Sequence, residues 1–256
     1  MSLRNLGSGN ALLCRMGDFG FHFRGLLIPG TLVTLLLTTR PSEALLDPSF
    51  ARTVTAIGIA ITLLGQAIRL FVVGFAYIKR GGKNRRIYAD DLVTEGVYAH
   101  VRNPMYVGNF LILVGLATTW GSPLAFAIGV PLIGFLYFVI VVAEEKYLRE
   151  KFGAGYDDYA RDVNRFVPRL EGLRETVRGS HYDWRKALRK EYGTPHGLGW
   201  GMLLLILVRT VRLEGFAGQQ HAFLVCAAIG IPWTLFYLAV RRWKMAGGLA
   251  SRAADA

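Results

Sequence analysis

The chain is dominated by long apolar runs that carry no charge. The longest, Asn103–Ala143, holds no Asp, Glu, Lys or Arg. A bilayer core about 30 Å thick is crossed by about 20 helical residues, so this run is too long for one span. Trp120-Gly121-Ser122-Pro123 interrupts it with residues typical of a tight turn. We therefore expect two helices that form a hairpin and return the chain to the membrane face from which it started.

Four further runs complete the pattern. Gly215–Val240 is charge-free, and Thr53–Ile78 is interrupted only by Arg69. Gly25–Thr39 and Thr194–Val208 are shorter than a usual span, so each is either a short tilted helix or a re-entrant segment. The pattern predicts about six transmembrane helices with a cytoplasmic cap, which is an all-α, polytopic integral membrane protein.

Composition supports the same class. Of 256 residues, 52% are hydrophobic and 19% charged, and the mean hydropathy is +0.33. Soluble domains carry nearer a quarter charged residues, so a soluble enzyme, a secreted disulfide scaffold and a disordered protein are excluded. Cys14 and Cys226 lie far apart, and no spacing of His, Cys and acidic residues suggests a metal site.

The charge is strongly positive and unevenly placed. The formal net charge is +12, and basic residues gather at Lys79–Arg102, at Lys146–Lys190 and after the last span. With six spans, both termini are then cytoplasmic, because cytoplasmic loops carry the excess of Lys and Arg. In a bacterium this membrane would be the plasma (inner) membrane. The partner expected for this charge is an anionic lipid bilayer rather than nucleic acid, and the oligomeric state is open.

The long polar segment after the fourth span divides the chain. We expect a membrane core over residues 1–170, and a cytoplasmic amphipathic linker plus a C-terminal transmembrane hairpin over residues 171–256. The fourth-span helix should continue into this segment as far as Gly153, supported by Glu145–Arg149 and Lys146–Glu150 pairs. The patch His181–Lys190 is most simply a helix lying on anionic lipid, with an active-site lid as the alternative.

Two polar clusters could carry chemistry. Asn103-Pro104 is typical of a helix start, with Asn103 as the cap, and exposed amides beside Arg102 would also suit an anion. Glu144-Glu145 lies where the fourth span leaves the membrane, where two carboxylates are costly unless they are paired or functional. The hairpin brings both clusters to one face, and together they would suit a zwitterionic or mixed-charge ligand.

Both clusters belong to longer signatures. The stretch Leu92–Gly108 resembles the Gly-x-Tyr-x-x-x-Arg-(His/Asn)-Pro-x-Tyr-x-Gly signature of the isoprenylcysteine carboxyl methyltransferase family. The stretch Glu144–Tyr159, followed by Val167-Pro168, resembles that family's second signature, Glu-Glu-x-x-Leu-x-x-x-Phe-Gly-x-x-Tyr-x-x-Tyr. The related phospholipid methyltransferases share this pattern. The two signatures occur in the right order over about a third of the chain.

The resemblance implies a membrane enzyme that transfers a methyl group from S-adenosyl-L-methionine to an oxygen, nitrogen or sulfur of a lipophilic or small apolar acceptor. It implies that Arg102 and Glu145 are catalytic. The residues it assigns to the cofactor are Leu92, Val93, Tyr98, Asn103, Pro104, Met105, Tyr106, Glu144 and Glu145.

This chain departs from the family pattern at two places. Asn103 stands where the commonest signature has His, so no histidine base is expected there. The carboxyl methyltransferases have an Arg about one turn before the glutamates, where this chain has Ile140-Val141-Val142. A prenylated protein C-terminus is therefore a less suitable acceptor than a lipid-like or small apolar molecule.

Two other functions fit parts of the pattern. A membrane reductase related to the sterol reductases would use NADPH, and a transporter would have no catalytic site. Among single residues, Arg69 is expected to form a structural ion pair with Glu144 or Glu145, in preference to contacting a ligand. His100 is read as an exposed interfacial residue in preference to a proton acceptor.

Overall fold

The computed structural model describes residues 8–75, 80–83 and 86–249. Six long helices form the membrane part: α1 (Ser8–Thr38), α2 (Pro48–Phe75), α3 (Pro104–Trp120), α4 (Pro123–Phe152), α8 (Gly193–Glu214) and α9 (Gln220–Met245). All but α3 are long and apolar enough to cross a membrane, and α3 is a shorter apolar helix. The predicted all-α, polytopic membrane fold is confirmed, although residues 76–78 of the predicted second span lie outside the described residues.

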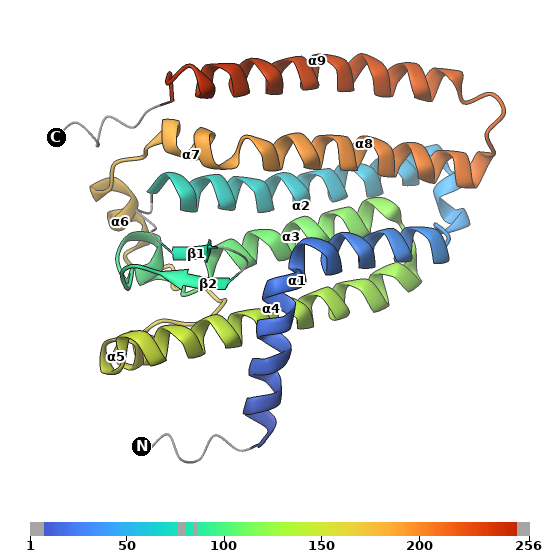
Figure 1. Cartoon of the computed structure of the whole chain (residues 1–256). Helices are drawn as coiled ribbons and strands as arrows, with labels where there is room; N and C mark the ends of the chain where they lie inside the picture. The colour runs from blue at the N-terminus through green and yellow to red at the C-terminus, as the bar shows by residue number, and fades with distance from the viewer. Residues whose placement is uncertain (1–7, 76–79, 84–85, 250–256) are drawn as a thin grey trace.

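The short elements gather at one end of the long helices (Figure 1). They are the hairpin β1 (Arg80–Lys83) and β2 (Arg86–Ala89), the 3₁₀ turn η3 (Gly96–Ala99), and the helices α5 (Ala154–Asp162), α6 (Leu173–Gly179) and α7 (Trp184–Glu191). The antiparallel hairpin pairs Arg80 with Ala89 and was not predicted. At the opposite end, the 3₁₀ turn η2 (Glu43–Leu46) joins α1 to α2.

The predicted α3–α4 hairpin is confirmed, and local chemistry makes its turn. Gly121 ends α3 at a φ of 68°, in the left-handed region that favours glycine. Ser122 caps α4, since its side chain accepts a hydrogen bond from the Ala125 amide at 3.3 Å, and Pro123 takes the first helical position. The hairpin therefore returns the start of α3 and the end of α4 to the same end of the molecule.

Helices α2 and α3 pack through small residues. A Cβ at Gly65 would lie 2.6 Å from the Gly108 carbonyl oxygen, and one at Gly115 would lie 2.6 Å from the Gly58 carbonyl oxygen. Such close backbone approach is the usual way in which membrane helices gain van der Waals contact, because lipid supplies no hydrophobic force between them. This packing fixes α3, which begins with the last residues of the first signature, Pro104–Gly108.

The two short apolar runs belong to longer continuous helices. α1 begins at Ser8, includes Arg24 and contains Pro29. Figure 1 shows that α1 bends in its middle, as expected where a proline removes a backbone hydrogen bond. α8 begins at Gly193, and Arg209 on it donates to the Thr119 carbonyl oxygen at 2.6 Å. That bond ties the C-terminal hairpin to the end of α3, where helix carbonyls lack partners.

Helix α4 runs past its apolar part to Phe152 and ends at Gly153, as predicted. The Lys146–Glu150 pair is present at 3.6 Å. The predicted Glu145–Arg149 pair is wrong. Arg149 instead pairs with Asp157 at 2.6 Å, because Glu145 faces the interior and is bound there by other cations.

Candidate functional site

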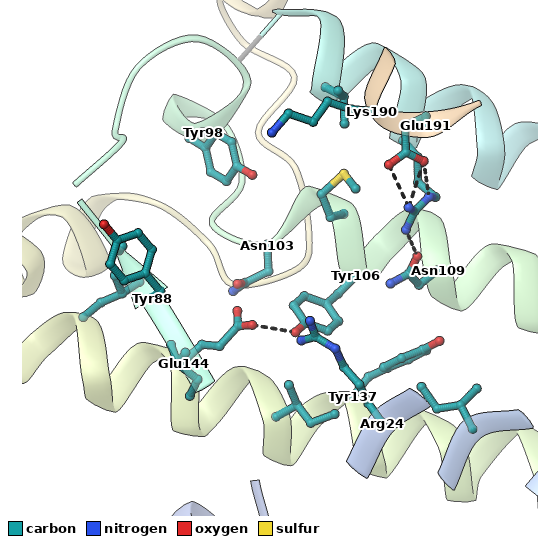
Figure 2. Close-up of a pocket in the computed structure, with 18 of the residues that line it drawn as sticks. Arg24, Tyr88, Tyr98, Asn103, Tyr106, Asn109, Tyr137, Glu144, Lys190 and Glu191 are labelled. Carbon is teal, nitrogen blue, oxygen red and sulfur yellow. Dashed lines mark hydrogen bonds and ion pairs between the residues drawn. The ribbon is translucent and has the colours of Figure 1, made fainter. Parts of the chain in front are cut away.

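A cavity of about 530 Å³ is lined by residues of the long helices together with residues of the short elements β2, η3 and α7. It lies between α1, α2, α3, α4, α7 and strand β2, and Figure 2 shows its polar side chains pointing inward. This volume is within the range of small-molecule and cofactor sites. The polar residues that line it are Arg24, Arg69, Tyr88, Tyr98, Asn103, Tyr106, Asn109, Tyr137, Glu144, Lys186, Lys190 and Glu191.

The two consecutive glutamates of α4 have different environments. Successive residues of a helix point about 100° apart, so Glu144 and Glu145 cannot face the same way. Glu144 lines the cavity and accepts a hydrogen bond from the Tyr106 hydroxyl at 2.7 Å (Figure 2). The Tyr106 ring in turn meets the Tyr137 ring edge-on, with 5.7 Å between centroids. Glu144 and the two tyrosines therefore form one wall.

Glu145 is buried beside the cavity in a cluster of charges. Its side chain is 5% exposed and accepts hydrogen bonds from Arg165 Nε at 3.0 Å and Arg165 Nη2 at 2.8 Å. The Arg102 guanidinium lies 3.7 Å away. The bond to Glu145 raises the pKa of Arg165 above its ordinary value. These contacts fasten the segments before α3 and after α5 to α4.

Asn103 joins this cluster to the cavity. It is the N-cap of α3, as predicted, but only its backbone carbonyl accepts from the helix, from the Tyr106 amide at 3.1 Å. Its side-chain amide donates to Glu145 Oε1 at 3.2 Å and to the Arg165 carbonyl at 3.3 Å. Asn103 thus lines the cavity, and its hydrogen bonds to Glu145 and to the Arg165 carbonyl hold its side chain in place.

The structure brings together some of the residues expected to bind the cofactor and not others. Tyr98, Asn103, Met105, Tyr106 and Glu144 line the cavity. Leu92, Val93, Pro104, Glu145 and Arg102 are not among the residues that line it. Leu92 packs against the cluster around Tyr156, and Val93 packs against Val72, Val97 and Tyr98, so both support the wall from outside.

Arg69 forms a buried ion pair, as expected, but with a partner that the sequence did not suggest. It donates to both oxygens of Glu191 at 2.8 to 3.0 Å, and to the Asn109 side chain (Figure 2). The partner is therefore Glu191 of α7 and not Glu144 or Glu145. The sequence indicated only that Arg69 needs a partner, because an unpaired arginine within an apolar span costs free energy, and it did not indicate which residue the partner is.

Helix α7 is part of the cavity wall. Lys186, Lys190 and Glu191 line the cavity, and α7 packs against α2. Two lysines of the segment expected to lie on lipid, Lys186 and Lys190, therefore line the cavity, which is the placement that the alternative predicted for them. His100 is also corrected: it is buried, and its ring nitrogens lie 2.9 Å from the Arg169 carbonyl and from Thr176 Oγ1.

Comparison with known proteins agrees with the two signatures. Residues 53–155 match the family model "Phospholipid methyltransferase". A probable protein-S-isoprenylcysteine O-methyltransferase of Oryza sativa subsp. indica is 30% identical over 134 residues, which cover 51% of this chain and 70% of that protein. The chain therefore belongs to the family of membrane methyltransferases that includes the phospholipid methyltransferases and the protein-S-isoprenylcysteine O-methyltransferases. The family uses S-adenosylmethionine, so the reductase and transporter alternatives are set aside.

Other members match over shorter stretches. The protein-S-isoprenylcysteine O-methyltransferase of Xenopus laevis is 28% identical over 123 residues, which cover 47% of this methyltransferase and 42% of the Xenopus protein. The nickel-cobalt-cadmium resistance protein NccN of Alcaligenes xylosoxydans xylosoxydans is 37% identical over 84 residues, which cover 33% of this methyltransferase and 39% of NccN. No solved structure matches this methyltransferase. Within the described ranges, no group of three or more His, Cys, Asp and Glu side chains could hold a metal ion.

The cavity residues fit S-adenosylmethionine. The cofactor carries ammonium and sulfonium cations beside a carboxylate, and the cavity offers the Glu144 carboxylate, the Asn103 amide and the faces of Tyr98 and Tyr106. Cations bind favourably to carboxylates and to aromatic faces.

Proposed function

We propose that this methyltransferase holds S-adenosylmethionine in the polar cavity and methylates a lipophilic acceptor whose apolar part lies between α3 and α4. The observation that carries the proposal is that two pockets share a wall. Tyr106 and Tyr137 line both the polar cavity and a separate apolar groove.

The groove has the chemistry of a lipid-binding surface. Its volume is about 560 Å³. Its lining residues are Tyr106, Val107, Phe110, Val130, Pro131, Gly134, Tyr137, Phe138 and Phe166. Most of them belong to the two helices of the membrane hairpin, so an acceptor could enter from the bilayer without crossing water. Its reactive atom would then meet the cofactor at the shared tyrosines.

The residues present suit a reaction that depends on alignment. The cofactor supplies an electrophilic methyl group on a good leaving group. Glu144 would bind its cationic groups, with the Tyr106 hydroxyl fixing the carboxylate. Holding two reactants in line contributes about 7–11 kcal/mol to lowering a barrier. Asn103, which replaces the usual histidine, has no ring nitrogen to act as a base, so the proposal requires no strong base.

Arg102 and Glu145 were expected to be catalytic, and we assign them a positioning role. Their contacts hold Asn103 and the start of α3 against α4. Leu92, Val93 and Pro104 would support the cofactor wall in the same indirect way. We further propose that the cavity end faces the cytoplasm, with both termini there, since the basic loops lie at this end.

Isothermal titration of the whole detergent-purified protein tests the cofactor assignment. We expect heat on adding S-adenosylmethionine and none on adding NADPH. Glu144→Gln should weaken S-adenosylmethionine binding about tenfold or more, as expected for a lost charge-assisted contact. Lys146→Gln is the matched control, because Lys146 is exposed on the same helix. Unchanged affinity in Glu144→Gln would contradict the placement of the cofactor in this cavity.

A further inference from the structure

The two tyrosines that line both the polar cavity and the apolar groove differ in what their hydroxyls contact. The Tyr106 hydroxyl donates to Glu144 at 2.7 Å. The Tyr137 hydroxyl makes no hydrogen bond to any residue that the structure describes. Figure 2 shows the Tyr106 hydroxyl directed toward Glu144 and the Tyr137 hydroxyl directed away from it. Where the two pockets share a wall, the hydroxyl left for a ligand is therefore that of Tyr137.

The position of Tyr137 follows from the periodicity of α4. Tyr137 precedes Glu144 by seven residues, which is about two turns, so the two side chains lie on one face of the helix. Ile140 lies between them on this face, and all three residues line the cavity. Residues 138–143 are all apolar and include the turn where the carboxyl methyltransferases have an arginine. The nearest polar side chain before Glu144 on α4 is therefore Tyr137.

The groove restricts the chemistry of a group that reaches Tyr137 from the bilayer. Among the described residues, none that lines the groove is charged. A charged group that entered by this route would have no charged partner, and burying an unpaired charge is costly. The tyrosine hydroxyl can donate and accept a hydrogen bond, whereas a thiol is only a weak donor. An uncharged hydroxyl is thus the group that best matches both the groove and Tyr137.

We propose that Tyr137 binds the reacting atom of the acceptor, and that this atom is the oxygen of an uncharged hydroxyl group on a lipophilic molecule. The inference rests on the proposed function and adds the residue and the substrate class. The acceptor hydroxyl donates its hydrogen to the Tyr137 oxygen, which leaves a lone pair of the acceptor oxygen facing the cavity. That oxygen bonds to the methyl carbon as the carbon–sulfur bond breaks. The bonding pair stays on sulfur, and the hydroxyl proton passes to water in the cavity.

The contacts of the Tyr137 ring link the acceptor residue to the cofactor residue. Glu144 fixes the Tyr106 hydroxyl, and the Tyr106 ring meets the Tyr137 ring edge-on with 5.7 Å between centroids. Edge-on contact between aromatic rings is favourable and does not involve the hydroxyl of Tyr137. Tyr137→Phe therefore keeps the ring and its packing, and it removes only the oxygen to which the proposal assigns a role.

Binding of matched amphiphiles to the whole protein in dodecyl maltoside tests the hydroxyl contact without the cofactor. The probes are dodecanol, dodecyl methyl ether, which has no hydroxyl hydrogen, and dodecanoate, which is charged. We expect the unaltered protein to bind dodecanol more tightly than the other two. Tyr137→Phe should weaken dodecanol binding about threefold to tenfold, as expected for one neutral hydrogen bond, and leave binding of the ether nearly unchanged.

Tyr147→Phe is the matched control. It removes a hydroxyl from the same helix at a position that lines neither the cavity nor the groove, so dodecanol binding should not change. Equal weakening in Tyr147→Phe, or equal weakening of dodecanol and the ether in Tyr137→Phe, would mean a general effect on α4 and would overturn the proposal. If dodecanoate binds more tightly than dodecanol, the acceptor is anionic and the proposed hydroxyl class is wrong.

Titration with S-adenosylmethionine separates this inference from the proposed function. We expect Tyr137→Phe to bind the cofactor with the affinity of the unaltered protein, in contrast to Glu144→Gln. If Tyr137→Phe loses as much cofactor affinity as Glu144→Gln, its hydroxyl serves the cofactor and the proposal fails. If the unaltered protein binds S-adenosylmethionine but does not distinguish dodecanol from the ether, only the assignment of Tyr137 and the hydroxyl class fails. If it binds no S-adenosylmethionine, the proposed function itself fails, whichever amphiphile binds.

Discussion

Replacing Glu191 with glutamine removes the carboxylate that neutralises Arg69. The side chains of Arg69 and Glu191 are 14% and 8% exposed, so the pair is largely removed from water. Removing one partner of a buried pair costs about 3–5 kcal/mol, because the other charge is left uncompensated. Here we expect about 3 kcal/mol, since Arg69 keeps its bond to Asn109 and the cavity admits water.

The assay is the free energy of unfolding in detergent, with hydrogen exchange of the α7 amides as a second readout. Glu191→Gln should lower the unfolding free energy and speed exchange in α7, because Glu191 fastens α7 to α2. Changing both Arg69 and Glu191 to methionine should restore much of the stability, since no buried charge is then left alone. Glu175→Gln, at an exposed position on α6, is the control.

An unfolding free energy within about 0.5 kcal/mol of the unaltered protein, together with unchanged exchange in α7, would refute this reasoning. It would mean that α7 is held by its other contacts alone. The pair would then be a consequence of the position of α7 and not a cause of it.

Three further outcomes follow from the structure. Gly65→Leu should abolish correctly folded protein in size-exclusion chromatography, because a Cβ there would lie 2.6 Å from the Gly108 carbonyl; a monodisperse variant would contradict the α2–α3 packing. Glu145→Gln should lower the thermal midpoint far more than Lys146→Gln, since Glu145 is buried among arginines; equal shifts would be inconsistent with that cluster. Burial lowers the pKa of Lys186 in the folded protein. Between that lowered pKa and 10.5, the unfolded chain therefore binds more protons than the folded protein does. The free energy of unfolding should rise with pH across this window, and it should rise more in the unaltered protein than in Lys186→Met. Identical pH profiles would argue against the partial burial of Lys186.

Much of the fold could be predicted because charge-free runs report membrane helices directly. The hairpin at Gly121 was predictable from turn residues alone, and the structure has it there. The first half of α1 could not be found in this way, because Arg15, Asp18 and Arg24 interrupt its hydropathy. A charge that faces a cavity is tolerated in a membrane helix, but the sequence does not show which charges do so.

The site was predictable where its residues are neighbours in sequence. Tyr98, Asn103 and Tyr106 fall within one signature, and all three line the cavity. Both Glu144 and Glu145 were expected to bind the cofactor, but only Glu144 lines the cavity, because successive residues of a helix point in different directions and the packing of α4 decides which one faces it.

Residues contributed by distant segments could not be predicted. Glu191 lies 122 residues after Arg69, and nothing in either neighbourhood links them. Lys190 was read as lipid-facing because an amphipathic basic helix has the same pattern on a membrane surface as over a cavity. Only tertiary packing distinguishes the two placements.

The central claim is that this cavity delivers a methyl group to a lipophilic acceptor, and transfer of isotopically labelled methyl tests it most directly. Membranes containing the protein would be incubated with methyl-labelled S-adenosylmethionine, and the organic extract examined by mass spectrometry. We predict labelled lipid-soluble product with the unaltered protein and with Lys146→Gln, and little with Glu144→Gln. No labelled product from the unaltered protein, or an equal yield from Glu144→Gln, would contradict the account.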